Sequence, residues 1–143
     1  MYALLCSILF WIHHPTKESQ TESLVGRWES EIRDGRMEFF RAGDTYAARI
    51  LWGNQVVEAD GKTSKKDLKN PDPARRNRDI LGMTYITGLR FGEGGYSGGS
   101  LYNPLDGNTY HCKIHLKGDD LYLRVYLGVP LLGETRIWRR MKD

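Results

Sequence analysis

Apolar and polar residues alternate along much of the chain. In 109–117 every second side chain is apolar or aromatic, namely Tyr110, Cys112, Ile114 and Leu116. The same period recurs in 45–52 and in 121–127, where the apolar series ends at Leu127. A period of two is typical of a β-strand with one buried face and one solvated face. These segments therefore predict strands that share a core.

Short turn signals separate the apolar segments. They are the dipeptides Asp34-Gly35, Gly43-Asp44, Gly53-Asn54, Asp106-Gly107 and Gly118-Asp119. Such dipeptides favour hairpin turns because glycine, asparagine and aspartate tolerate a positive φ. The two signals together predict about eight strands, at 25–33, 36–41, 45–52, 84–91, 97–103, 108–117, 120–127 and 133–141. Antiparallel strands remove their unpaired edges by closing into an up-and-down barrel, so the expected fold class is all-β.

A glycine-rich segment, 92–99, falls between two of these strands, and Tyr96 is its only bulky residue. Glycine-rich loops can bind phosphate, but this one has no lysine and no following helix. We therefore expect a wide turn in a bent hairpin here.

The chain has 143 residues, of which 40% are apolar and 27% are charged. That length and composition fit one globular domain. The net charge of +3 is too small to indicate nucleic-acid binding. It is also local, because the segment from Asp60 to Asp79 holds seven basic residues against four aspartates. The basic residues are Lys62, Lys65, Lys66, Lys69, Arg75, Arg76 and Arg78.

This basic segment has no strand pattern, and irregular loops of about twenty residues are often functional. Asp72 followed by Pro73 favours a helix start, so we expect one helical turn through Asn77. Asp67, Asn70 and Asp72 offer oxygen ligands but lack the spacing of a calcium loop. We interpret them as acceptors for backbone N–H groups of the loop.

Arg75 and Arg78 lie three positions apart, on one side of that helical turn. They can bind a carboxylate or phosphate of a ligand, or pair internally with Asp67, Asp72 or Asp79. The internal ion pairs are favoured, because the acidic residues accompany the arginines. We interpret the lysines of the segment as solvated surface with a weak attraction for anionic lipid.

The N-terminal segment 2–12 is an apolar run of 11 residues. Its length suits the hydrophobic part of a secretory signal and is too short to span a bilayer. No basic residue precedes the run, and no small-x-small cleavage motif follows it. We expect a leader over 1–19, a domain over 20–143 and a secreted or periplasmic location. The alternative is an N-terminal strand or helix that packs on the core.

Two tryptophan motifs lie near the two ends of the expected domain. Gly26 and Trp28 open the first strand, and Trp138 and Arg140 close the last. In lipocalin-like barrels a Gly-x-Trp on the first strand meets an arginine from the end of the chain. The tryptophan closes one end of the barrel and the guanidinium covers its ring. The two motifs therefore resemble those of a lipocalin-like barrel.

Longer motifs extend the resemblance over about 25–141. They are Asp67-x-x-Asn70-Pro71-Asp72-Pro73, Arg75 with Arg78, Ile80-Leu81-Gly82, Gly98-Gly99-x-x-Tyr102-x-Pro104-x-Asp106-Gly107-x-x-Tyr110, Tyr126-Leu127-Gly128 and Trp138-x-Arg140. In that order they resemble the bacterial domain-of-unknown-function 2147 family. The resemblance implies a lipocalin-like fold, export, and structural roles for the motif residues. Many relatives carry cysteine pairs where this chain has Ala42 and Ala47, so no disulfide is carried over.

Reactive side chains give no catalytic or metal site. Ser97, Asp106 and His111 are the members of a hydrolase triad, but no nucleophile elbow surrounds the serine. His111 and His115 share a strand face but lie roughly 13 Å apart, too far for one metal ion. With Cys6 and Cys112 as its only cysteines, the chain cannot build a disulfide scaffold. We expect no cofactor and no catalysis.

The leading hypothesis is an exported binder of a small hydrophobic or amphipathic ligand. An apolar barrel interior suits such a ligand. The expected ligand-binding residues are Phe39, Tyr46, Trp52, Arg75, Arg78, Tyr96 and Tyr110. The alternative is an envelope interaction module with a filled barrel, working through its surface. A third hypothesis is an enzyme with a mouth carboxylate, Asp67 or Asp106. Membrane contact is at most peripheral, and the oligomeric state stays open.

Overall fold

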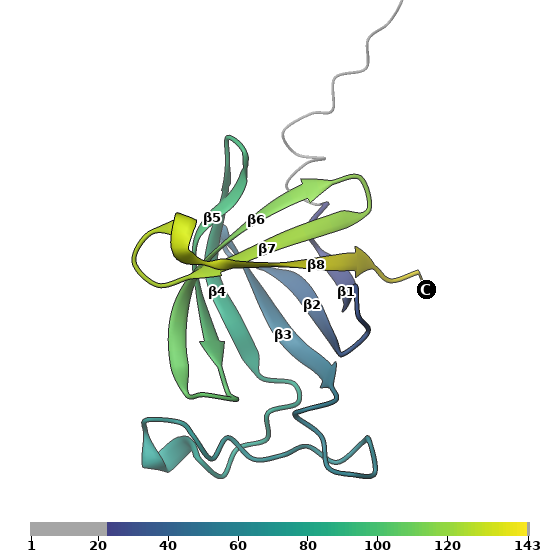
Figure 1. Ribbon diagram of the computed structural model, residues 1–143, viewed down its shortest axis with the longest axis vertical. Coiled ribbons are helices and arrows are strands. Elements are labelled where there is room, and N and C mark those ends of the chain that lie inside the picture. The colour runs from purple at the N-terminus through teal and green to yellow at the C-terminus, as the bar shows by residue number, and fades with distance from the viewer. Residues whose placement is uncertain (1–22, 143) are drawn as a thin grey trace, which may run out of the picture.

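The strands of the protein close into an antiparallel barrel in a computed structural model that describes residues 23–142 (Figure 1). They are β1 (Gly26–Ser30), β2 (Gly35–Ala42), β3 (Thr45–Gly53), β4 (Thr84–Gly92), β5 (Gly95–Asn103), β6 (Asn108–Lys117), β7 (Asp120–Tyr126) and β8 (Glu134–Arg140). Each strand pairs with the next, and β8 pairs back with β1. The expected all-β barrel is confirmed. The expected leader, 1–19, lies outside the described residues.

The alternation of side chains sets the two faces of the strands. On β6, Cys112 and Ile114 are buried in the core, whereas His111 and His115 are exposed, as the pattern predicts. On β7, Leu121 and Leu123 are buried. The same series does not extend to Leu127, which lies beyond the end of β7 and is 58% exposed. The expectation that Leu127 continues the buried face is therefore wrong, because the strand ends before it.

The expectation of a wide turn over 92–99 is also wrong. β4 continues to Gly92, β5 begins at Gly95, and only Glu93 and Gly94 form the turn. Gly99, within β5, serves packing instead. A Cβ on Gly99 would lie 2.7 Å from Cys112 Sγ and 2.7 Å from Leu89 Cδ2, so the strand can approach its neighbours only without a side chain.

Strand directions divide the connecting segments between the two ends of the barrel. One end, here the Trp28 end, holds 23–25 and the turns that follow β2, β4 and β6. The other, here the loop end, holds the β1–β2 turn (31–34), the β3–β4 loop (54–83), the β5–β6 turn (104–107) and the β7–β8 loop (127–133). Figure 1 shows the β3–β4 loop as the large irregular segment below the barrel.

The Trp28 end is closed by side chains. Trp28 is fully buried, and its Nε1 donates to the carbonyl of Leu24 at 2.9 Å. The guanidinium of Arg140 lies 4.3 Å from the centre of the Trp28 ring and donates to the carbonyls of Val25 and Ser23. Guanidinium groups favour both the ring face and such carbonyls. Residues 23–25 are thereby held across this end of the barrel.

The β3–β4 loop contains a short 3₁₀ helix, Pro73–Arg75. Asp72 caps it, since its Oδ1 accepts a hydrogen bond from the backbone N–H of Ala74 at 3.0 Å. This is the helix start that the Asp-Pro pair predicts, although the helical segment is shorter than expected. None of the helices in 23–142 is long and apolar enough to cross a membrane.

Candidate functional site

A cavity of about 590 Å³ opens at the loop end of the barrel. Strands β4 to β8, the β5–β6 turn and the β7–β8 loop form its walls. It is lined by Tyr85, Leu101, Asn103, Leu105, Asp106, Tyr110, Leu123, Val125, Tyr126, Leu127, Leu132, Gly133, Glu134, Arg136 and Trp138. Its size lies in the range of sites for small organic ligands.

The inner wall of the cavity is apolar and belongs to the barrel core. Leu101, Leu123 and Trp138 come from β5, β7 and β8, and each is almost fully buried. The strand register places Leu101 opposite Tyr110 and places Trp138 opposite Leu121. Because these side chains point inward, the cavity extends from the mouth into the barrel rather than lying on its outer surface.

Polar groups stand at the mouth. The hydroxyl of Tyr110 donates to Oδ2 of Asp106 at 2.6 Å. Partial burial alone would raise the pKa of Asp106, but this hydrogen bond and one from the Asn108 backbone hold that pKa below its usual value. The same bond raises the pKa of Tyr110. Asp106 is therefore a carboxylate, and Tyr110 a neutral phenol, at neutral pH.

The β8 side of the mouth carries one acidic and one basic residue. Glu134 lines the cavity together with Arg136. Arg136 is held by the β1–β2 turn, since its Nη2 donates to Asp34 Oδ1 at 2.7 Å and to Oδ2 at 2.9 Å. Its guanidinium also lies 5.8 Å from the centre of the Trp138 ring. These contacts fix Arg136 in one position beside the cavity.

Tyr85 is the polar group at the inner part of the cavity wall. Its hydroxyl donates to Met37 Sδ at 2.9 Å. Burial raises the pKa of Tyr85, so the phenol stays neutral. The indole Nε1 of Trp138 is buried and has no hydrogen-bond partner among residues 23–142. The inner wall thus offers a ligand mostly apolar surface.

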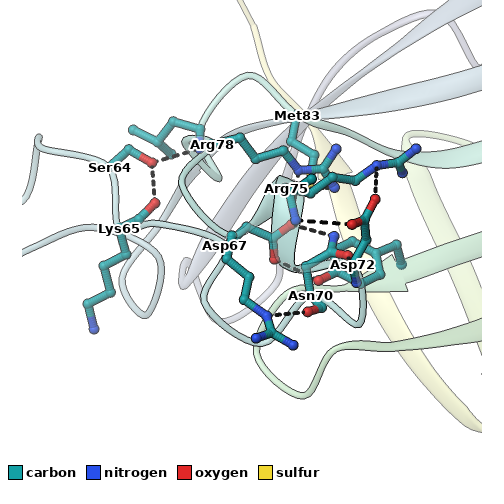
Figure 2. Close-up of polar contacts among 12 residues, drawn as sticks. Ser64, Lys65, Asp67, Asn70, Asp72, Arg75, Arg78 and Met83 are labelled. Carbon is teal, nitrogen blue, oxygen red and sulfur yellow. Dashed lines mark hydrogen bonds and ion pairs between the residues drawn. The ribbon is translucent and has the colours of Figure 1, made fainter.

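The β3–β4 loop is attached to the barrel by the buried carboxylate of Asp67, which is drawn with its neighbours in the loop in Figure 2. Asp67 is fully buried and accepts hydrogen bonds from Tyr102 Oη at 2.6 Å, Asn70 Nδ2 at 2.8 Å and Arg78 Nε at 2.9 Å. Burial would raise the pKa of Asp67, but these three donors together lower it. Burial and the bond to Asp67 raise the pKa of Tyr102 to about 12.

The rest of the loop is built from similar local contacts. Asn70 Oδ1 accepts from the N–H of Asp72 at 2.9 Å, and the Asn70 carbonyl accepts from Arg76 Nε at 2.8 Å. Arg75 Nε lies 3.5 Å from Asp72 Oδ2. The loop also touches the β5–β6 turn, where a Cβ on Gly107 would lie 2.1 Å from the carbonyl oxygen of Lys69. The loop is therefore an ordered wall beside the mouth.

The structure places the residues expected to bind a ligand in different parts of the molecule. Tyr110 lines the cavity. Phe39, Tyr46 and Tyr96 are buried in the core, and the last two meet edge to face at 5.4 Å between ring centres. Trp52 lies outside the core and donates from Nε1 to the carbonyl of Gly61 at 3.0 Å.

The two arginines of the expected site face their own loop. Arg78 bonds Asp67, and Arg75 lies against Asp72, so the internal ion pairs favoured by the sequence are present. Several cavity residues were missed, among them Tyr85, Leu101 and Val125. The alternation could have identified them as inward-facing, but it carries no signal for their height along the barrel.

The considered catalytic and metal combinations do not assemble. Ser97 follows the turn at the Trp28 end, whereas Asp106 lies at the loop end. His111 and His115 are exposed and lie beside Tyr126 and Tyr122. No group of three metal-ligating side chains occurs in the part of the chain that the structure describes.

A closed barrel of eight antiparallel strands, with a tryptophan closing one end and a cavity at the other, defines a lipocalin-like protein. The chain belongs to the bacterial family described as "Uncharacterized protein conserved in bacteria (DUF2147)", whose model matches residues 26–140. A solved structure described as "Protein HP1028 from the human pathogen Helicobacter pylori belongs to the lipocalin family" is similar to it. The two share 29% identity over 84% of each chain, with a TM-score of 0.73. No curated protein sequence matches the chain. The lipocalin-like fold suggests ligand binding as the general class of function.

Proposed function

We propose that this protein binds a small hydrophobic or amphipathic ligand in the cavity at the loop end, without catalysis. The observation that carries the proposal is the cavity of about 590 Å³, whose inner wall is built from buried leucine and tryptophan side chains. Burial of apolar ligand surface against such a wall supplies most of the binding free energy of small-molecule sites.

The mouth supports an amphipathic rather than a wholly apolar ligand. Asp106, Tyr110, Glu134 and Arg136 lie around the entrance, while Leu101 and Leu123 lie deeper. An apolar tail can then occupy the barrel while a polar group stays at the entrance near water. A few placed polar groups around an apolar pocket commonly fix the orientation of a ligand.

The carboxylates of this region support binding over acid–base catalysis. A general acid at neutral pH needs a carboxyl with a raised pKa. Hydrogen bonds lower the pKa of both Asp67 and Asp106, which were the two candidates. Both carboxylates also accept hydrogen bonds from tyrosine hydroxyls. The alternative of a surface module with a filled barrel expects no cavity at the barrel mouth.

We also propose that the protein acts outside the cytoplasm. The support is the apolar run at 2–12 and the resemblance of the motifs to an exported family. The mass of the N-terminal peptide of the protein from its native host tests this. A processed N-terminus in a periplasmic or secreted fraction is expected, and an intact Met1 on cytoplasmic protein would overturn export alone.

Ligand binding is tested with a cavity-filling variant and a matched control. Val125→Phe adds bulk to the cavity wall, whereas Thr87→Phe adds it to an exposed position on β4. Anilinonaphthalene sulfonate fluorescence, with displacement by straight-chain fatty acids and aromatic acids, measures affinity. We expect Val125→Phe to weaken binding at least about tenfold and Thr87→Phe to leave it unchanged.

Two results would contradict the proposal. One is native mass spectrometry that finds no retained ligand, together with no melting shift across the panel. A bound ligand at a hundred times its Kd should add about 2.7 kcal/mol to stability, which such a shift would show. The other is equal affinity of the two variants, since binding would then lie outside the cavity.

A further inference from the structure

The apolar surface of this protein is concentrated at one end of the barrel. In residues 23–142, eight large apolar side chains are exposed, and seven of them lie in the four connections at the loop end. Four belong to the β7–β8 loop, and the other three connections carry one each: Ile32, Leu68 and Leu105. Val25, at the Trp28 end, is the eighth. Such a concentration marks an interaction surface.

The leucines of the β7–β8 loop are held outward by a fixed backbone. Arg124 donates from Nε to the carbonyl of Pro130 at 2.8 Å, from Nη2 to the carbonyl of Leu131 at 3.1 Å, and from Nη1 to Thr135 Oγ1 at 2.9 Å. On this backbone Leu131 is 85% exposed and Leu132 78% exposed. Their exposure is therefore built into the loop.

Cations accompany these apolar side chains at the same end. In the β3–β4 loop, Lys62, Lys65 and Arg76 are exposed and form no ion pair within the described residues. Lys65 extends away from the polar cluster around Asp67 (Figure 2). Their charge is thus available to an external partner.

We propose that the loop end docks on the surface of an anionic lipid membrane. Apolar side chains on separate loop tips can each enter the interface between headgroups and acyl chains, and neighbouring cations attract anionic headgroups. The cations of the β3–β4 loop that form no ion pair within 23–142, Lys62, Lys65 and Arg76, and the distribution of apolar side chains over four separate connections favour a deformable lipid surface over a rigid protein partner.

Docking in this orientation extends the proposed function. Leu105, Leu127 and Leu132 are exposed at the loop end and also line the cavity. A docked protein therefore presents the mouth of its cavity to the bilayer. An acyl or aromatic ligand can then move between membrane and barrel without crossing water. The ligand class is in this case a membrane-derived amphiphile.

The test is flotation of the purified full protein with phosphatidylcholine vesicles, with and without phosphatidylglycerol. Every variant keeps the same N-terminal segment, so its contribution to binding is constant. The double variant Leu131→Ser with Leu132→Ser should reduce partitioning at least about tenfold, because both leucines are removed from the lipid interface. The matched control Val25→Ser changes the exposed apolar residue at the other end and should leave partitioning unchanged.

A charge-reversal pair tests the electrostatic part. Lys62→Glu with Lys65→Glu should weaken binding to phosphatidylglycerol vesicles at least about fivefold per charge, and added salt should remove the difference. Lys142→Glu, at the Trp28 end, is the control and should have little effect. Melting temperatures of all variants should stay near that of the unchanged protein, since every altered side chain is exposed.

The outcomes separate docking from ligand binding. Unchanged partitioning of the leucine double variant overturns docking through the loop end. No vesicle binding, together with tight ligand binding in solution, overturns docking alone. Vesicle binding without any ligand in the cavity overturns the proposed function alone. A dimer that the leucine double variant converts to a monomer, with no vesicle binding, assigns the leucines to self-association and also overturns docking.

Discussion

The hydroxyl of Tyr102 donates a hydrogen bond of 2.6 Å to Oδ1 of Asp67, and this joins the β3–β4 loop to the barrel wall at β5. The other oxygen of the same carboxylate accepts from Asn70 and Arg78, both within the loop. One buried carboxylate therefore organises the loop internally and attaches it externally. Its charge is satisfied by three donors rather than by solvent.

We predict that Asp67→Asn destabilises the protein by about 2–4 kcal/mol, because the amide cannot accept from all three donors and leaves Arg78 without its carboxylate. The pKa of Asp67 is lowered in the folded state. Its contribution is therefore fully present above the unfolded pKa, about 3.9, and is lost as pH falls through the folded pKa. Urea unfolding across acidic and neutral pH measures this.

The control for that series is Asp79→Asn. Asp79 lies on the same loop but is exposed and pairs with Lys66 on the surface, at 2.7 Å. A surface pair contributes about 0–1 kcal/mol, so this variant should keep both the stability and the acid dependence of the unchanged protein. Equal effects of the two substitutions would mean that the buried network does not hold the loop.

The contact between the loop and the β5–β6 turn gives a second prediction. Gly107 has a φ of 77°, and a Cβ there would overlap the Lys69 carbonyl oxygen. Gly94 has a φ of 78° with nothing within 4 Å of the same position. Both alanine variants carry the backbone strain of about 1 kcal/mol, but Gly107→Ala must also displace the loop.

We therefore expect Gly107→Ala to cost at least about 1 kcal/mol more than Gly94→Ala in the free energy of unfolding. It should also speed tryptic cleavage within the basic loop of the folded protein, because the loop loses its contact with the turn. Limited proteolysis followed by mass spectrometry identifies the cleaved bonds. Similar stability and similar cleavage rates for the two variants would contradict the close packing of loop and turn.

The Trp28 end gives a third prediction. Trp28→Ala removes a fully buried ring from the end of the core and should cost about 3–5 kcal/mol. Arg140→Ala removes the cover of that ring and two hydrogen bonds to carbonyls, and should cost about 2–3 kcal/mol. Thermal and urea denaturation measure both.

Arg139→Ala is the matched control for Arg140→Ala. Arg139 is the preceding residue of β8, and its side chain is 57% exposed in surface ion pairs with Glu31 and Asp120. Its removal should cost under about 1 kcal/mol. A cost for Arg140→Ala as small as that of Arg139→Ala would show that the guanidinium does not stabilise the closed end.

The strands could be predicted because their signals are local. Alternation and glycine-containing turns identify β2, β3, β6 and β7 almost to their ends. One error arose where a single residue type serves two purposes. Glycine in 92–99 marks a turn at Gly94 but a close strand approach at Gly99, and sequence alone does not distinguish these.

The cavity was harder to predict because it depends on position along the barrel axis. Alternation predicts that Tyr110 points inward, but it does not give the distance of a side chain from Trp28 along the barrel axis. The barrel closure brings Leu24 and Trp28 into one end, so Tyr96 is enclosed there, whereas Tyr110 faces the open space at the other. The position of an aromatic side chain along the barrel axis follows from strand register and tilt, which depend on pairings between residues distant in sequence.

The pairing of β1 with β8 has a consequence for how the chain folds. All the other strand pairs join strands that are consecutive in sequence, whereas β8 pairs with β1. The distance in sequence is large, since Arg140 donates to the carbonyl of Val25, 115 positions away. Neighbouring strands can form hairpins early. Closing the barrel between β1 and β8 costs more conformational entropy, because the whole intervening chain must be ordered or looped. During synthesis the sheet stays open at both edges, with Trp28 uncovered, until β8 emerges. A chain stopped before β8 would be left with two unpaired edges and a strong tendency to associate.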